Sequence, residues 1–294
     1  MKRVLITGAN SYIGTSFEKY INKHYPEQFS IDTVDMIDGS WREYDFSGYD
    51  CIFHVAGFAH RKETEENKQL YHSINCDLAI ETAEKAKKSG VKHFVYLSSM
   101  SVFGKEVGVI THESKPTPKS NYGISKHNAE LRLSEIKDES FKISVLRPPM
   151  VYGYGCKGNF QKVVKLVRKF PFFPSINNQR SMIYIDNLCE FVRLIIEKEC
   201  EGLFHPQNKD YINTTNMARV IAKGLQKKIV NGKLLGMLVM AIYPFVSLVK
   251  KSFGSLIYKN MESLDFDYQV YDFENSVLLS VVGENYEKNN SDNI

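Results

Sequence analysis

The chain has 294 residues, enough for one full α/β domain and a smaller lobe. Its hydrophobic content of 43% is that of a globular protein, and a net charge of +4 without basic residues aligned with aromatics argues against nucleic-acid binding. Five dispersed cysteines, an odd number, indicate free thiols in a reducing cytoplasm. The chain enters an expected strand at once, which leaves no room for a signal peptide.

The first expected strand covers residues 2–7 and leads through a glycine-rich turn into a helix that begins near Thr15. Strand, glycine turn and helix in this order are the context that a dinucleotide fingerprint needs. Gly8 permits the tight turn, Gly14 lets helix and strand pack closely, and the helix N-terminus offers N–H groups to a pyrophosphate. Ser11 stands where a third glycine is common, which weakens the motif and leaves an ordinary strand-to-helix turn as the alternative.

The second expected strand, residues 30–35, ends in an acidic residue. Asp35 lies 21 residues after Gly14, close to the spacing of the carboxylate that binds the adenosine ribose hydroxyls. A carboxylate there repels a 2′-phosphate, so NAD(H) is favoured over NADP(H). Arg42 is near enough in sequence to keep NADP as an alternative, and a solvated loop acid is the alternative for Asp35.

Strand and helix continue to alternate as far as residue 147. Further strands are expected at 51–57, 92–97 and 142–147, with helices from about 70 to 88 and from about 122 onward. This spacing predicts an α/β fold with a Rossmann-like, doubly wound parallel sheet, whose ligands bind at the carboxyl ends of the strands. We assign the dinucleotide-binding domain to 1–155 plus 180–213, a smaller, discontinuous substrate-binding lobe to 156–179 plus 214–285, and a frayed tail to 286–294.

Tyr122 and Lys126 form the most informative pair in the chain. Four residues apart on the expected helix, they lie on one face, one turn apart. A lysine ammonium lowers the pKa of a nearby phenol, which can then exchange a proton with a sugar hydroxyl near neutral pH. The pattern is common by chance, and its weight comes from the glycine turn, Asp35 and the upstream pair Ser98-Ser99. Each of these residues also has an ordinary structural role open to it, such as capping a turn.

Together these motifs resemble the extended short-chain dehydrogenase/reductases of the NAD-dependent epimerase/dehydratase family, which act on nucleotide sugars. The resemblance covers about residues 1–215 and implies NAD as cofactor. It implies the catalytic residues Ser99, Tyr122 and Lys126, with Phe103 replacing the tyrosine of the family's Ser-x-x-Val-Tyr-Gly pattern. The cofactor-binding residues that it implies are Gly8, Ser11, Tyr12, Ile13, Gly14, Asp35, Asp45, Phe46, Val55, Ala56, Gly57, Asn75, Tyr122, Lys126 and Pro149. The substrate-binding residues are Ser99, Asn159, Phe160 and Arg180, whose guanidinium suits a diphosphate.

Departures from the family pattern narrow the reaction. Family dehydratases carry Thr-Asp-Glu where this chain has Ser99-Met100-Ser101, so the acid/base pair for dehydration is missing. Hydride transfer at C4 with Tyr122 as acid/base remains, as in a UDP-sugar 4-epimerase or, alternatively, an NAD(P)H-dependent 4-ketoreductase. Two features weaken the epimerase interpretation: Met150 stands where many 4-epimerases have asparagine, and no second phosphate-binding arginine is evident late in the chain. A non-catalytic NAD-sensing module is disfavoured, because such modules commonly lose the tyrosine or the lysine.

Residues 234–249 are sixteen positions without a charge, bracketed by Lys233 and by Lys250-Lys251. They fall short of the ~20 residues of a membrane-spanning helix. We expect a buried or partner-facing lobe helix there, with an interfacial membrane anchor over 234–251 as the alternative.

The remaining expectations concern smaller features and the setting of the protein. Asp186 is expected to cap a helix over 187–199. No metal site is expected, since His54, His60 and His93 lack ligand spacing. The resemblance implies a nucleotide-sugar substrate, a homodimer built through the helices after 70 and 122, and a cytoplasmic role in polysaccharide biosynthesis.

Overall fold

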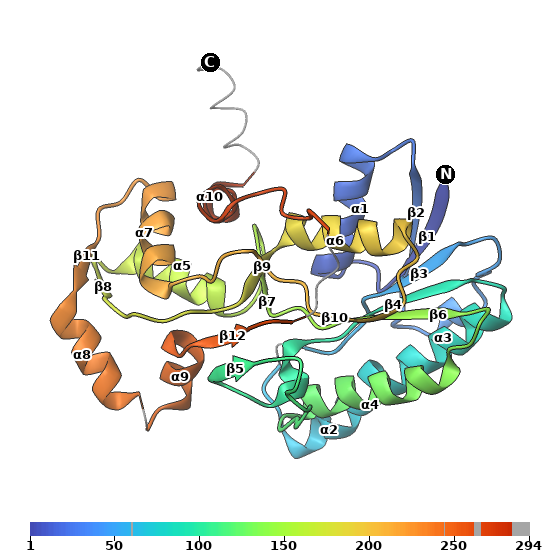
Figure 1. Cartoon of the computed structure of the whole chain (residues 1–294), viewed down its shortest axis with the longest axis horizontal. Helices are drawn as coiled ribbons and strands as arrows, with labels where there is room; N and C mark the ends of the chain where they lie inside the picture. Colours follow the sequence, from blue (N-terminus) through green and yellow to red (C-terminus); the bar gives the residue numbers. More distant parts are fainter. Residues whose placement is uncertain (60, 244, 262–265, 284–294) are drawn as a thin grey trace.

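A six-stranded, wholly parallel sheet organises the larger part of the molecule (Figure 1). The computed structural model describes residues 1–59, 61–243, 245–261 and 266–283, so the expected tail at 286–294 lies outside the described residues. The strand order is β10-β6-β4-β3-β1-β2. The chain first adds β2 on one side of β1 and then adds β3 and the later strands on the other side, so the order of addition reverses between β1 and β3. This confirms the doubly wound sheet and places a ligand crevice at that reversal. The strands are β1 (Lys2–Thr7), β2 (Phe29–Val34), β3 (Cys51–His54), β4 (His93–Leu97), β6 (Lys142–Leu146) and β10 (Gly202–Phe204).

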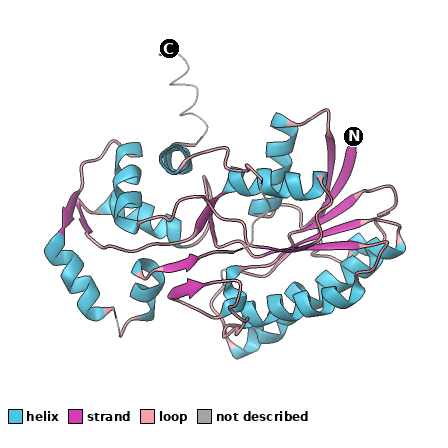
Figure 2. Ribbon diagram, viewed as in Figure 1, coloured by secondary structure: helices cyan, strands magenta, loops and turns pink. Residues whose placement is uncertain are grey.

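Helices cover both faces of this sheet (Figure 2). On one face, α1 (Tyr12–His24) packs on α6 (Ile185–Glu197); on the other lie α2 (Glu65–His72), α3 (Leu78–Lys88) and α4 (Asn121–Ile136). Successive residues of β1 serve opposite layers, because strand side chains alternate. Val4 and Ile6 belong to the core under α1 and α6, and Leu5 belongs to the core under α3 and α4.

The helix expected from about residue 70 begins earlier and is interrupted. It starts at Glu65, where Thr64 and Asn67 form a capping box, and a π-helical turn at Ser73–Asp77 separates α2 from α3. The polar residues of α2 have no apolar periodicity, which is why the pattern placed the start five residues late. The π turn carries Asn75, which is fully buried.

The structure corrects the expected role of Asp186. Helix α6 begins at Ile185 with Tyr184 as its N-cap, so Asp186 lies in the first turn and not at the cap. Its carboxylate there still faces the positive end of the helix dipole.

The smaller part of the molecule lies beyond the carboxyl ends of the strands, at the left of Figure 1. Three pairs of short parallel strands lie outside the six-stranded sheet: β5 with β12, β7 with β9, and β8 with β11. Helix α7 is capped by Asn213 and ends at Gly224. The remaining helices and strands of the whole chain are η1 (Ser40–Arg42), η3 (Met100–Phe103), β5 (Gly108–Ile110), β7 (Met150–Tyr152), α5 (Asn159–Lys169), β8 (Phe172–Pro174), β9 (Met182–Tyr184), α7 (Thr214–Gly224), β11 (Val230–Gly232), α8 (Lys233–Ile242), α9 (Ser247–Phe253), β12 (Leu256–Tyr258) and α10 (Phe273–Val282).

The uncharged segment 234–249 forms most of α8 and the start of α9, with residue 244 outside the described residues. Of the expected buried or partner-facing helix, the buried form is wrong for α8, in which only Gly236 is buried, and the partner-facing form stays a prediction. No helix in the described part of the chain combines the length and the apolar content that crossing a bilayer requires.

Candidate active site

The glycine turn after β1 has the geometry of a cradle for a pyrophosphate. Gly8 has a φ of +117°, and a Cβ there would lie 2.7 Å from the backbone nitrogen of Ala56. A Cβ on Gly14 would lie 2.6 Å from Ser11 Oγ and 3.0 Å from a Val55 methyl group. Ser11, the weak point of the motif, caps α1 by accepting a hydrogen bond from Gly14 N at 3.1 Å. The turn therefore needs both glycines and leaves the first N–H groups of α1 for an anion.

The residues expected around the adenosine lie directly after β2 and in the loop that follows it. Asp35 is exposed just beyond β2, and its carboxylate accepts a hydrogen bond from Ile37 N at 2.9 Å. The Arg42 guanidinium binds Glu81 of α3, with Nη2 2.6 Å from Oε2, so it is already committed as an ion pair. This favours NAD over NADP. Asp45 binds the amide and hydroxyl of Ser47, while Phe46 is fully buried in the core.

The strand end after β3 meets the π turn of the α2–α3 helix. Asn75 Oδ1 accepts from Phe58 N at 2.7 Å, and its Nδ2 donates to Ser125 Oγ at 3.0 Å. A Cβ on Gly57 would lie 3.1 Å from Asn75 Oδ1 and 3.5 Å from Lys126 Nζ. Gly57 and Asn75, two of the expected cofactor residues, are thus brought against helix α4, whereas Val55 and Ala56 lie against the glycine turn. On α1, Tyr12 has a buried hydroxyl that finds no hydrogen-bond partner among the described residues, and Ile13, the next residue, is half-buried. The glycine cradle and this orphaned hydroxyl fit a bound dinucleotide.

The lysine of the catalytic pair is buried. Lys126 is only 3% exposed, its Nζ donates to Leu97 O at 2.8 Å, and the Tyr96 ring centroid lies 4.6 Å away. Burial lowers its pKa to about 7, against a smaller opposing effect of the Glu130 carboxylate. Lys126 therefore connects α4 to the end of β4 through this hydrogen bond.

Tyr122 lies in the first turn of α4, behind the N-cap Ser120, and is half-buried. Burial raises the pKa of its phenol, and a side-chain hydrogen bond with Ser99 lowers it by a smaller amount. The expectation that Lys126 governs this pKa is wrong for this arrangement, because the ammonium is directed at Leu97 O. The expected catalytic residues Ser99 and Tyr122 are nevertheless brought into direct contact.

We expect the folding stability of the protein to rise with pH because of Lys126. Its pKa is about 7 in the folded chain against an ordinary 10.5, so between these values only the unfolded chain binds the proton. Stability therefore increases from pH ~7 towards pH ~10, and relative to Lys126→Met the gain by pH ~9 is about 2 kcal/mol. Urea unfolding of the wild type and of Lys126→Met at pH ~7 and at pH ~9 measures this gain. An equal change in unfolding free energy in the two proteins would contradict a buried lysine with a lowered pKa.

A buried ion pair that sequence reasoning missed supports the catalytic helix. Glu130 of α4 binds Arg147, with Nε 2.9 Å from Oε1 and Nη2 2.6 Å from Oε2, and it also accepts the hydroxyl of Ser98. Both charged residues are less than a tenth exposed. The sequence contains no local signal for this pair, because Glu130 and Arg147 lie 17 residues apart on different elements. The network fixes α4 against the strand ends that carry Ser98 and Pro148.

A cavity of about 460 Å³ is walled by the smaller part of the molecule, and Ser99, Tyr122 and Lys126 are not among its lining residues. It brings together Asn159 and Arg180, two of the expected substrate-binding residues, and includes Met150 just after Pro149. Phe160, expected to touch the substrate, is instead fully buried and stacks on Tyr152. Arg180 Nη1 donates to Gly254 O at 2.6 Å, and burial lowers the pKa of the guanidinium. The cavity therefore has one fixed guanidinium at its wall.

Lysines not singled out from the sequence line the same cavity. Lys162, Lys165 and Lys169 come from α5, and Lys251 comes from α9. The remaining walls are largely apolar, from Val163, Leu166, Phe170, Met217, Val249 and Phe253. Cations around an apolar cleft suit a diphosphate with a bulky carrier group. These four lysines make the wall of the cavity cationic.

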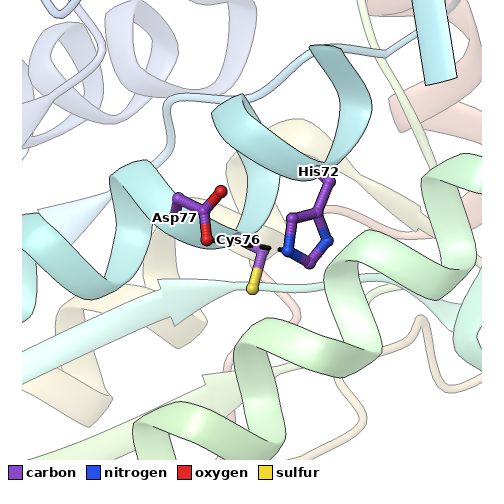
Figure 3. Close-up of side chains that lie close together, drawn as sticks. All are labelled: His72, Cys76 and Asp77. Carbon is purple, nitrogen blue, oxygen red and sulfur yellow. Dashed lines mark ion pairs between the residues drawn. The ribbon is translucent and has the colours of Figure 1, made fainter. Parts of the chain in front are cut away.

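His72, Cys76 and Asp77 lie close together where α2 meets α3 (Figure 3). His72 Nε2 is 3.6 Å from Asp77 Oδ1, and Arg132 of α4 donates to the same oxygen at 2.6 Å. Burial raises the pKa of the Cys76 thiol, which opposes the thiolate that a metal would need. The cluster joins the π turn to α4 through Arg132.

Comparison with known proteins agrees with this geometry. Residues 4–205 match the model of the NAD dependent epimerase/dehydratase family. The chain is 29% identical over 251 residues to a UDP-glucose 4-epimerase of Vibrio cholerae, covering 77% of this chain and 76% of that protein. It is 25% identical over 246 residues to the N-acetyl-alpha-D-glucosaminyl-diphospho-ditrans,octacis-undecaprenol 4-epimerase of Escherichia coli O157:H7, covering 77% and 73%.

Solved structures show the same fold over nearly the whole chain. The UDP-glucuronic acid 4-epimerase from Bacillus cereus superposes with a TM-score of 0.72 at 18% identity, covering 98% of this chain and 99% of that one. A dTDP-4-dehydrorhamnose reductase from Bacillus anthracis gives 0.68 at 20% identity, covering 96% and 99%. Family match, fold and site agree with one another. The chain therefore belongs to the NAD-dependent epimerase/dehydratase family and is an NAD-dependent enzyme with a Rossmann-like sheet.

Proposed function

We propose that this enzyme inverts the configuration at C4 of a UDP-sugar by transient oxidation. The observation that carries the proposal is the contact between Ser99 and Tyr122 at the first turn of α4, with Lys126 buried one turn later. The likeness to the Vibrio cholerae UDP-glucose 4-epimerase supports the reaction. Bound NAD supplies the acceptor and donor of the hydride.

Each protein group has a defined part in this reaction. In its deprotonated form, which burial disfavours in the protein alone, Tyr122 takes the proton of the C4 hydroxyl during oxidation and returns it during reduction of the other face. The hydroxyl of Ser99 hydrogen-bonds the same oxygen and keeps it beside Tyr122. Arg180 and the cavity lysines hold the diphosphate, so that the sugar can turn while its carrier stays bound.

A nucleotide-sugar 4-ketoreductase would use the same residues, and cofactor content separates the two reactions. We expect protein purified without added cofactor to release about one equivalent of NAD⁺ on denaturation, because an epimerase regenerates its cofactor in place. A dinucleotide site that fills only from added NADH or NADPH would support the ketoreductase instead.

Replacing Arg180 with Met tests the placement of the diphosphate. Loss of a charge-assisted hydrogen bond is expected to raise KM for the UDP-sugar about 10- to 100-fold, with a smaller change in kcat. Lys209→Met, which removes an exposed cation paired with Asp267 at 2.9 Å, is the matched control and should leave KM unchanged. An unchanged KM in Arg180→Met would place the diphosphate elsewhere.

A sugar diphosphate carried by a polyprenol is a second candidate substrate. It is favoured by the cavity mouth, where Leu166 and Phe170 both line the cavity and remain 41% and 45% exposed. An apolar opening suits a lipid carrier, and the Escherichia coli relative is named for such a substrate. Conversion of the polyprenyl-linked sugar but not the UDP-sugar would select this carrier.

The proposal also includes a setting for the enzyme. We place it in the cytoplasm as a homodimer formed by the helices that follow residues 70 and 122. Leu70 of α2 and Ile124 and Leu131 of α4 are exposed, which supports a helical contact there. Residues 234–251 are proposed to touch a membrane.

A further inference from the structure

Helix α8 presents an apolar surface that the described part of the chain leaves uncovered. The helix rests on β8 through Gly236, where a Cβ would lie 2.2 Å from Ser175 O. Met237 is 64% exposed and Leu238 is 58% exposed, and Phe245 just beyond the helix is 87% exposed. Large apolar side chains at such exposure are costly in water. We call this surface the α8 face; its members are Leu234, Leu235, Met237, Leu238, Met240, Ile242, Phe245 and Val246.

The charge around the α8 face is of one sign. Segments 156–179 and 214–261, which build α5, α7, α8 and α9, contain thirteen lysines and arginines and no aspartate or glutamate. The chain as a whole carries only +4, so the remainder is net acidic. A single diphosphate does not account for thirteen cations. Within the described ranges, carboxylates from outside these segments pair with Lys223, through Glu274, and with Lys251, through Glu106.

The apolar and basic features lie at the same end of the molecule, at the left of Figure 1. Lys228 precedes β11, and Lys233 is the first residue of α8; both are exposed. Phe172 of β8, the strand on which α8 rests, is 60% exposed and lies two residues after Phe170 at the cavity mouth. Two exposed aromatic side chains, Phe170 and Phe172, therefore lie on the segment that joins the cavity wall to the strand under α8.

We infer that the α8 face is a membrane-binding surface for an anionic phospholipid bilayer. Apolar side chains of α8 enter the interface, and the surrounding lysines bind lipid phosphates, as in interfacial amphipathic helices. The cavity that holds Arg180 then opens at the membrane surface. This assignment does not depend on which sugar the enzyme converts, because membrane binding needs no substrate.

Vesicle flotation of the full-length protein tests the inference. Binding is expected to vesicles of equal parts phosphatidylcholine and phosphatidylglycerol, and much less to phosphatidylcholine alone. Raising the salt from ~0.1 M to ~1 M shortens the Debye length from about 10 Å to about 3 Å and should release most of the protein. Failure to float with the anionic vesicles would overturn the inference, whether or not the protein is an active epimerase.

Two variants separate the apolar from the basic contribution. Met237→Ser combined with Leu238→Ser, and separately Lys228→Glu combined with Lys233→Glu, should each lower the vesicle partition coefficient about tenfold. Leu203→Ser, at a position 45% exposed on the edge strand β10, is the matched control and should float like the wild type. Flotation that survives both double variants would overturn the assignment.

A second copy of the chain is the competing occupant of the α8 face. The molar mass of the protein without vesicles, measured by light scattering, distinguishes a second copy from the membrane. A mass that is unchanged by Met237→Ser combined with Leu238→Ser supports the membrane. A mass that halves in this variant, without flotation of the wild type, shows that the face joins two protomers and overturns the inference.

Discussion

Tyr122→Phe is expected to lower kcat for C4 inversion by about 10²- to 10⁴-fold while the protein keeps its fold and its bound NAD. The substitution removes one oxygen, which is the group that exchanges the proton with the C4 hydroxyl. The ring remains packed at the first turn of α4, and the Ser99 hydroxyl remains beside it. Steady-state kinetics and the NAD content after denaturation measure the two effects.

A matched control shows that the loss is specific to this phenol. Tyr154, which is 64% exposed, should tolerate replacement by Phe without a change in kcat. Unchanged kcat in Tyr122→Phe would remove the proposed acid/base. A parallel loss of bound NAD would instead make Tyr122 a cofactor contact first.

Arg147→Met is expected to cost about 3–5 kcal/mol of folding free energy, the largest stability effect of the substitutions considered. The change leaves the Glu130 carboxylate, 7% exposed, without its guanidinium partner. An unpaired buried charge is expensive, whereas the pair itself need not be stabilising. Urea unfolding at pH ~7 gives the difference directly.

Glu130→Gln in the Arg147→Met background should recover most of the lost stability, because the buried charge is then gone. Lys209→Met breaks an exposed ion pair and should cost less than about 1 kcal/mol. A cost for Arg147→Met as small as that of Lys209→Met would mean that water reaches Glu130.

The parts of the site that could be predicted are those fixed by local spacing. Gly8 and Gly14 flank one strand-to-helix turn, and Tyr122 and Lys126 lie one turn apart on one helix, so local backbone geometry dictates the interval within each pair. The parallel sheet followed from the alternation of strands and helices, which the strand order confirms.

Features that depend on tertiary packing could not be predicted in this way. Glu130 and Arg147 meet only once α4 lies along β6, 17 residues away in sequence. The pKa of Tyr122 follows burial and Ser99 because Lys126 turns to Leu97 O, which its spacing does not reveal. The sequence of α8 does not reveal whether the helix is buried or exposed, because an uncharged run without polar positions has no periodicity that marks a buried face.

The most direct test of C4 inversion is to incubate the purified enzyme with UDP-sugars in deuterated water without added cofactor. The account predicts formation of the C4 epimer with no deuterium at C4, because the hydride leaves and returns through bound NAD while Tyr122 exchanges only the hydroxyl proton. A C4 epimer that carries solvent deuterium at C4, or conversion that begins only when NADH or NADPH is supplied, would contradict it.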